Sequence, residues 1–338
     1  MNFTNYFLRF TALVILGAIL ILLSSCETNP PNAPSLPKLE FGKIFVTANV
    51  DGAMIFLNDI NSGKVTPDTI ETAIGTYELR LEKENYLSSV QMVEVLKDSV
   101  IELTFSLEET VPRVVLLEDF ANVSCLPCVQ SNKITESLIN NTYGHSKLVA
   151  VKYPTNWPSP IDPFYLANSE ACDARISYYN ISVAPTIIID GTQTPISTDS
   201  ISIKEAIDQQ LQQTPQFSLE VSDSIAGSNY FTTVTIKVLD GSGLDFSNIV
   251  LHSVVTETEI EFANPPGSNG ETKFYDVMRV MLPTNEGESL NGISQTEEVV
   301  YHRQTSINPI WNVSKLNTVA FIQDVSTKVV YQAGSTFD

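Results

Sequence analysis

Basic residues and histidines are scarce in this chain. Its 338 residues include 19 Lys and Arg against 39 Asp and Glu, a formal net charge of −20. So acidic a chain is a poor ligand for nucleic acid or anionic lipid, and we expect no nucleic-acid partner. The three histidines, His145, His252 and His302, are scattered, and no second pair of ligands stands at zinc-site spacing. GxSxG, P-loop and GxGxxG motifs are missing as well, so we expect neither a metal ion nor a cofactor.

Cysteine and long apolar runs are also rare. The 4 cysteines are too few for a dense disulfide framework. One apolar run, from Phe10 to Leu23, follows Arg9. It is short for a membrane span and is typical of the apolar region of a secretory signal peptide. Hydrophobic residues still make up 43% of the chain, enough for packed cores, and the length suggests about two or three domains.

The segment Leu23-Ser24-Ser25-Cys26 ends this apolar run and resembles the lipobox of bacterial lipoproteins. The resemblance implies that residues 1–25 are a signal peptide and that Cys26 carries a lipid anchoring the chain to a membrane. An ordinary signal peptide followed by a chance cysteine is the alternative. Residues 26–40 are rich in Pro and Asn, which predicts a flexible tether. The implied location is the cell envelope of a Gram-negative bacterium, on the periplasmic or surface side of the outer membrane.

Residues 41–109 show the period-two alternation of a small β-sandwich. Ile44, Val46 and Ala48 alternate with polar residues, and glycines mark the turns between such runs. With Gly52-Ala53 before a strand and Asn85-Tyr86 further on, the segment resembles PEGA domains. The resemblance implies a surface module and names no ligand.

Residues 113–214 alternate strand and helix patterns in the order β-α-β-α-β-β-α. An apolar run ends before Cys125-Leu126-Pro127-Cys128, a helix is expected over 164–179, and Pro185 leads into another apolar run. A CxxC after the first strand together with a Pro before the third resembles the thioredoxin fold. The resemblance implies an α/β domain with the cysteine pair at the N-terminus of a helix.

Cys125 is the candidate nucleophile. A helix N-terminus favours a thiolate, which can attack a substrate disulfide, and Cys128 then resolves the mixed disulfide. Leu126-Pro127, between the cysteines, carries neither charge nor histidine, which favours a reducing or isomerising role. The alternative is an inert disulfide that staples a loop to the helix.

Two further residues match catalytic positions of the thioredoxin family. Asp119, six residues before Cys125, matches the buried Asp that helps to move the proton of the second thiol. A turn-capping role is the alternative. Pro185 matches the cis-proline beside which a substrate strand pairs, and a Pro at a strand entry is its alternative. Glu118 points to the opposite face if the strand continues, so we expect it to be solvated.

Ser124 and Cys172 restrict the redox activity that the thioredoxin resemblance implies. Ser124 stands where thioredoxins place a Trp, so the aromatic docking surface is missing, which favours a narrow substrate range or no substrate. Cys172 lies in the expected helix among Ala171 and Ala174, which is typical of a buried small apolar residue rather than a third redox cysteine.

Residues 216–338 return to strand patterns, at 231–238, 248–257, 273–281 and 319–331. They predict an all-β sandwich of immunoglobulin-like size. With the lipobox and the thioredoxin-like segment, the chain resembles the Omp-twenty-eight-related outer-membrane lipoproteins. The fold class expected is therefore multidomain, with a PEGA-like β-sandwich, a thioredoxin-like α/β domain and a C-terminal β-sandwich.

The resulting hypothesis is a membrane-anchored lipoprotein that exchanges disulfides with exported proteins. Its partners are the thiols or disulfides of those proteins and a redox partner that supplies electrons. No cofactor is required because the cysteine pair itself carries the electrons. The alternative is a surface binding or adhesion lipoprotein in which the thioredoxin-like fold is only a scaffold, and the missing Trp argues for it.

Overall fold

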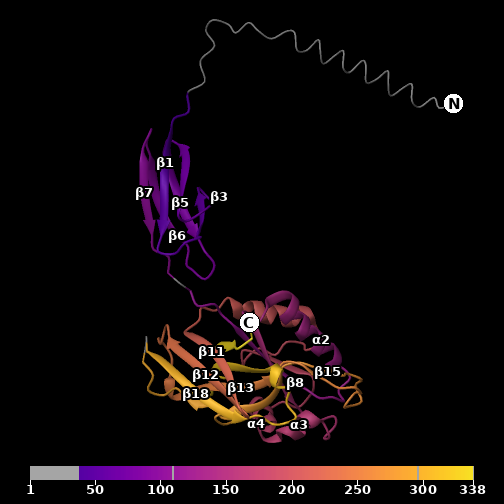
Figure 1. Ribbon diagram of the computed structural model, residues 1–338. Helices are drawn as coiled ribbons and strands as arrows, with labels where there is room; N and C mark the ends of the chain where they lie inside the picture. The colour runs from indigo at the N-terminus through magenta and orange to yellow at the C-terminus, as the bar shows by residue number, and fades with distance from the viewer. Residues whose placement is uncertain (1–37, 109, 295–296, 338) are drawn as a thin grey trace, which may run out of the picture. The chain divides into compact units, whose positions relative to one another are not determined.

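The computed structural model describes residues 38–108, 110–294 and 297–337, and the chain divides into two compact units at residue 108 (Figure 1). We call them the N-terminal unit (38–108) and the C-terminal unit (110–337). The expected signal peptide 1–25, the lipidation site Cys26 and nearly all of the tether lie outside the described residues. Within those residues, no helix is long and apolar enough to cross a membrane.

The N-terminal unit is built from two small sheets. One has the order β4-β1-β7 and the other the order β3-β2-β5-β6. Ile44 and Val46 of β1 are fully buried and pack with Leu79 and Leu81 of the second sheet. The alternation in the sequence therefore predicts this β-sandwich correctly. Its strands are β1 (Phe41–Ala48), β2 (Met54–Leu57), β3 (Ile60–Val65), β4 (Asp68–Ala73), β5 (Gly75–Glu82), β6 (Ser89–Val95) and β7 (Val100–Phe105).

The C-terminal unit is organised around one sheet of eight strands. Seven of them follow the order β10-β8-β9-β16-β13-β19-β20, and β17 pairs with β13. β8 and β9 are parallel, and β10 is antiparallel to β8. The bounds are β8 (Val115–Ala121), β9 (Leu148–Pro154), β10 (Thr186–Ile189), β13 (Ile249–Glu257), β16 (Val277–Leu282), β17 (Glu288–Ser289), β19 (Leu316–Asp324) and β20 (Val330–Ser335).

Helices cover both faces of the β10-β8-β9 portion. Ile203 and Ile207 of α5 and Leu138 of α2 pack on one face, whereas Cys172 and Ile176 of α4 pack on the other. The helix expected over 164–179 is interrupted at residue 168. The second strand expected after Pro185 is reduced to an isolated bridge. The helical elements are α2 (Cys128–Leu138), η1 (Ile139–Tyr143), α3 (Pro163–Ala167), α4 (Ser169–Tyr179) and α5 (Ser200–Leu211).

Residues 113–214 and 216–338 form one body rather than two separate domains. Sheet pairing crosses the expected boundary, since β9 runs parallel to β16 and Lys152 N donates to Asp276 O at 2.8 Å. A second sheet, β11-β12-β18, packs on β13 and β19 through Phe217, Val234 and Ile322. The predicted sandwich packing is thus present, but it shares a sheet with the α/β part. The remaining elements are β11 (Phe217–Ala226), β12 (Asn229–Val238), β14 (Ile260–Glu261), β15 (Lys273–Phe274), β18 (Glu298–Ser306), η2 (Phe246–Asn248) and η3 (Val313–Lys315).

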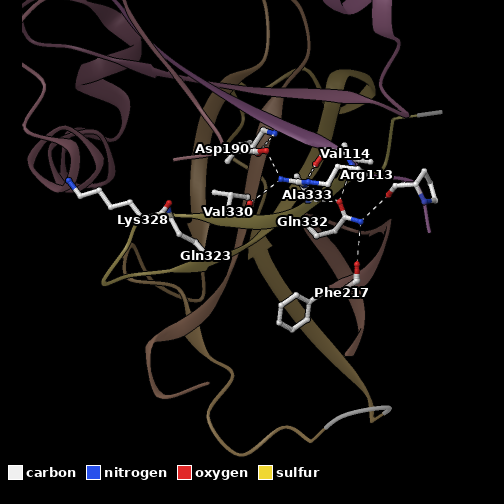
Figure 2. A network of polar contacts seen from close by, with 11 residues as sticks. Arg113, Val114, Asp190, Phe217, Gln323, Lys328, Val330, Gln332 and Ala333 are labelled. Atoms are coloured by element: carbon white, nitrogen blue, oxygen red, sulfur yellow. Dashed lines mark hydrogen bonds and ion pairs between the residues drawn. The ribbon is translucent and has the colours of Figure 1, made fainter. Parts of the chain in front are cut away.

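A buried polar network also joins the two parts of the C-terminal unit (Figure 2). Arg113, just before β8, forms an ion pair with Asp190 and donates to Val330 O at 3.0 Å and to Gln332 Oε1 at 3.2 Å. Gln332 in turn donates to Phe217 O at 3.3 Å. Four segments that are distant in sequence therefore meet at the guanidinium of Arg113 and the side-chain amide of Gln332.

Candidate functional site

The CxxC motif lies in the turn that leads from β8 into α2. Asn122 shapes this turn, because its Oδ1 accepts from Ser124 N at 2.9 Å and its backbone O accepts from Cys125 N at 3.0 Å. Val123 N donates to Asp162 Oδ2 at 2.9 Å, which ties the turn to the start of α3. The motif is therefore held by local polar contacts as well as by its strand and helix.

Cys125 and Cys128 form a disulfide, with an S–S distance of 2.06 Å. Cys128 N donates to Cys125 Sγ at 3.2 Å, so this sulfur is the acceptor for an amide at the N-terminus of α2. That contact is the one that would stabilise a thiolate on Cys125 after reduction. The exposed fraction is only 3% for Cys125 and 0% for Cys128, so both cysteines are covered.

Ala184 packs against the disulfide, together with Ala121 at the end of β8. The Ala184–Pro185 peptide bond is cis, and Pro185 directly precedes β10. The structure thus brings the candidate Pro185 loop next to the cysteine pair. Leu126, between the cysteines, and Val183, before Ala184, are 69% and 63% exposed. Two apolar side chains adjacent in sequence to this cluster therefore reach solvent, although the disulfide itself is covered.

Asp119 is buried within β8, with 1% exposure. Its Oδ2 accepts from Lys152 Nζ at 2.6 Å, and its Oδ1 has no hydrogen-bond partner among the described residues. The turn-capping alternative is wrong because Asp119 is a strand residue that pairs with Ile187 and Lys152. What remains is a buried carboxylate in an ion pair.

Lys152 and Asn132 belong to this site, and sequence analysis did not identify either of them. Lys152 Nζ donates to Asn132 Oδ1 at 2.5 Å, and Asn132 Nδ2 donates to the two carboxylate oxygens of Glu271 at 2.9 and 3.0 Å. The available signal was Lys152 within the otherwise apolar run LVAVKY, because a buried strand tolerates a lysine only when its charge is paired.

A cavity of about 550 Å³ lies along α2 beside this network. Asp119, Asn132 and Lys152 line it, together with Glu136 and Asp276. Burial raises the pKa of Asp276 to about 7, Lys152 opposes the rise and Glu136 adds to it. Charged groups of both signs therefore line the cavity, five carboxylates against four lysines.

The loop over residues 262–272, which we call the strap, crosses the CxxC turn. Asn269 N donates to Val123 O at 3.2 Å, and Ser268 N donates to Ser124 Oγ at 3.2 Å. A Cβ at Gly267 would lie 2.2 Å from Val123 O, so only glycine permits this approach. The strap therefore lies against Ser124, the residue that directly precedes the CxxC motif.

Glu118 is buried, contrary to the prediction that it is solvated, and its exposed fraction is 0%. Arg175 Nε of α4 donates to Glu118 Oε1 at 3.0 Å, and the Tyr179 hydroxyl donates to Oε2 at 2.6 Å. The face opposite Asp119 is covered by α4 and β19, so both faces of β8 are buried. Cys172 is a free buried cysteine, as expected, and burial raises its pKa.

Comparisons with known proteins give one family match and several similar solved structures. A PEGA-domain family model matches residues 41–111, in agreement with the sequence patterns of the N-terminal unit. No curated protein matches the chain. The structure of HBP35 of Porphyromonas gingivalis is similar, with a TM-score of 0.58 and 16% identity over 68% of this chain and 76% of that one. At that identity the similarity shows a shared fold.

Two other solved structures are more distant. A protein from Agrobacterium tumefaciens has a TM-score of 0.45 at 13% identity, over 68% of this chain and 94% of its own. A domain of the outer membrane lipoprotein Omp28 from Porphyromonas gingivalis has a TM-score of 0.25 at 16% identity, over 36% of this chain and 86% of its own.

Proposed function

We propose that the chain is a lipid-anchored protein of the bacterial cell envelope that exchanges disulfides with exported proteins. The observation that carries the proposal is the Cys125–Cys128 disulfide at the N-terminus of α2, packed against Ala184. The order β8-α2-β9-α4-β10-α5, with helices on both faces, supports a thioredoxin-like fold for this part. The lipobox resemblance at Cys26 supports the envelope location, with the outer membrane as the anchoring membrane.

In the reducing direction, the Cys125 thiolate attacks one sulfur of a substrate disulfide. A mixed disulfide forms, and the other substrate sulfur leaves as a thiolate that takes a proton from solvent. Cys128 then loses its proton and attacks Cys125 Sγ, which releases the second substrate sulfur as a thiol. Two electrons pass from the cysteine pair to the substrate, and a redox partner of the envelope returns them. The oxidising direction reverses each step.

The neighbouring residues have distinct roles in this proposal. Asp119 accepts the Cys128 proton through water, and the free Oδ1 of its carboxylate supports that role. Lys152 is a positioning residue that holds the other carboxylate oxygen at 2.6 Å. The Ala184–Pro185 loop provides backbone for a substrate strand to pair with.

Trapping of mixed disulfides tests the proposal. The Cys128→Ala variant lacks the resolving thiol, so it should retain exported proteins on Cys125 as mixed disulfides that dithiothreitol releases. Cys125→Ser is the matched control and should retain none. The full chain is expressed in its native host, and trapped species are compared on non-reducing gels. Equal patterns for the two variants would contradict a redox role.

A non-catalytic binding lipoprotein is the second candidate, and one observation favours it. Cys125 is only 3% exposed, and the strap lies over the turn that carries it. In this case the disulfide only stabilises the fold, and the apolar residues Leu126 and Val183 belong to a binding surface. Binding of a partner would then be unchanged in Cys125→Ser.

A further inference from the structure

We infer that the strap, residues 262–272, is an access gate that decides which partners reach Cys125. This inference rests on the proposed disulfide exchange, since it concerns the same cysteine. The strap belongs to the C-terminal strands and is distant in sequence from the CxxC motif. It lies against Val123, Ser124 and Cys125 because the C-terminal strands and the α/β part share one sheet.

The base of the strap is fixed. Phe262 N donates to Thr272 O at 2.8 Å, which closes the loop. The Phe262 ring lies 5.7 Å from that of Phe164 and 6.0 Å from that of Phe274, between ring centroids, and the cluster includes the buried Val123. Motion of the strap is thus confined to its tip.

The tip of the strap, around Ser268 and Asn269, is held by polar contacts, and the neighbouring Gly267 approaches Val123 closely. Besides the two backbone contacts to Val123 and Ser124, Asn269 Nδ2 lies 3.5 Å from Cys125 O and donates to Glu271 Oε2 at 2.7 Å. Glu271 accepts from Asn132 of α2, which also contacts Lys152. Contacts of this kind contribute little individually, so the tip can open without unfolding of the core.

The geometry also indicates what the gate excludes. The strap occupies the side of the turn at Ser124, whereas Leu126 and Val183 are exposed elsewhere around the disulfide. A folded protein that presents a broad surface would collide with the strap. A flexible segment carrying a disulfide could approach past Leu126 and Val183. We therefore assign extended or locally unfolded chains of exported proteins as the substrate class.

The test compares two maleimides on the same reduced thiol. Protein lacking Cys26 (Cys26→Ser) and carrying Cys172→Ala and Cys128→Ala is labelled with N-ethylmaleimide and with a maleimide on a protein-sized polyethylene glycol. The ratio of the large-reagent rate to the small-reagent rate measures access to Cys125. Because both reagents need the same thiolate, the ratio does not depend on the pKa of Cys125. It therefore remains informative even if Cys125 has no redox role.

Two strap variants should raise this ratio. Gly267→Val places side-chain atoms against Val123 O, and Asn269→Ala removes the side-chain contacts of the tip. We expect the ratio to rise by roughly tenfold in Asn269→Ala, and at least as much in Gly267→Val if that variant folds. Asn264→Ala is the matched control, because Asn264 is an exposed strap residue and should leave the ratio unchanged.

Two outcomes would overturn the gate. One is an unchanged ratio in a folded Asn269→Ala protein, and the other is an equal rise in Asn264→Ala. A raised ratio in the strap variants, combined with no mixed disulfides in the trapping experiment, would keep the gate and reject the exchange function.

Discussion

The two units of this protein differ in what their interiors contain. In the described part of the N-terminal unit, Thr66 is the one buried polar side chain. The C-terminal unit buries four ion pairs, and each of the paired side chains is at most 10% exposed. These pairs are Arg113–Asp190, Asp119–Lys152, Glu118–Arg175 and Glu257–Arg279.

The contrast shows how the C-terminal unit holds its distant segments together. Burial of a charge costs desolvation energy that a partner recovers only with good geometry, so such a pair penalises every arrangement in which the partner is missing. The Glu118–Arg175 pair joins β8 to α4, and Arg113–Asp190 lies where β8, β10 and β20 meet. The N-terminal unit, with short connections between its strands, is specified by apolar alternation alone.

The largest expected effect comes from breaking one buried pair. Arg175→Met leaves the Glu118 carboxylate buried without its cation, and we expect a loss of about 3–5 kcal/mol in the free energy of unfolding. Trp157 and Trp311 both lie in the C-terminal unit, so tryptophan fluorescence during urea unfolding reports this unit within the full chain.

The double variant Glu118→Leu with Arg175→Met should recover most of that loss, because no unpaired charge remains. The matched control is Lys43→Met in the N-terminal unit, which contains no tryptophan, so hydrogen exchange resolved by unit measures its stability. Lys43 lies 4.0 Å from Glu71, and the two side chains are 52% and 62% exposed. Its loss should cost less than about 1 kcal/mol. A similar cost for the two single variants would remove the contrast between the units.

The second effect compares one glycine from each unit. Gly191 and Gly52 have positive φ angles, +75° and +78°. A Cβ at Gly191 would lie 1.8 Å from Lys328 O, whereas at Gly52 the nearest atom is Lys83 Nζ at 3.6 Å. We expect Gly191→Ala to cost about 2–5 kcal/mol, from backbone strain and overpacking, and Gly52→Ala about 1–2 kcal/mol from strain alone. Hydrogen exchange resolved by unit measures both, and equal costs would show that the turn between β19 and β20 is not held closely against Gly191.

The third effect is a pH dependence confined to the C-terminal unit. His252 is 2% exposed, stacks on Phe321 and lies near Arg175. Burial, and then the charge of Arg175, lower the pKa of His252 well below its usual range. The unfolded chain takes up a proton near pH 6.5 and the folded chain does not, so stability falls as pH drops below about 6.5. The slope approaches about 1.4 kcal/mol per pH unit for one proton.

Urea unfolding of His252→Gln at pH 7.5 and 5.5 checks this (about one pH unit on each side of the free-histidine value). The variant should lack only the His252 contribution, so its stability at pH 5.5 relative to pH 7.5 should be higher than that of the unsubstituted protein. Burial raises the pKa values of Asp190 and Asp276 to about 7, which gives the opposite slope over the same range, but in both proteins, so the difference between them isolates His252. An unchanged slope in the variant would mean that another group causes the acid sensitivity.

Sequence patterns predicted the N-terminal unit because strands such as β1 alternate with period two around one apolar core. In the C-terminal unit, patterns predicted most individual strands, whereas it was the thioredoxin resemblance that implied Asp119 and Pro185 as neighbours of the cysteine pair. The patterns did not predict that Glu118 is buried, because a strand covered on both faces does not alternate.

The continuous sheet and the strap could not be predicted from local sequence patterns either. The pairing of β9 with β16 and the contact of Asn269 with Val123 join residues that are far apart in the chain. No local pattern encodes either contact. A lysine in the apolar run at Lys152 and a glycine at Gly267 were the available signs, and each becomes interpretable only when its distant partner is known.

The most direct test of the proposed disulfide exchange is the alkylation rate of Cys125 as a function of pH. Reduced full chain lacking Cys26 and carrying Cys172→Ala is labelled with iodoacetamide, and the modified residue is identified by mass spectrometry. If the helix N-terminus activates this thiol, the rate rises with a midpoint well below the free-cysteine value of about 8.5. A midpoint at or above that value would contradict a redox role and leave the disulfide as a structural bond.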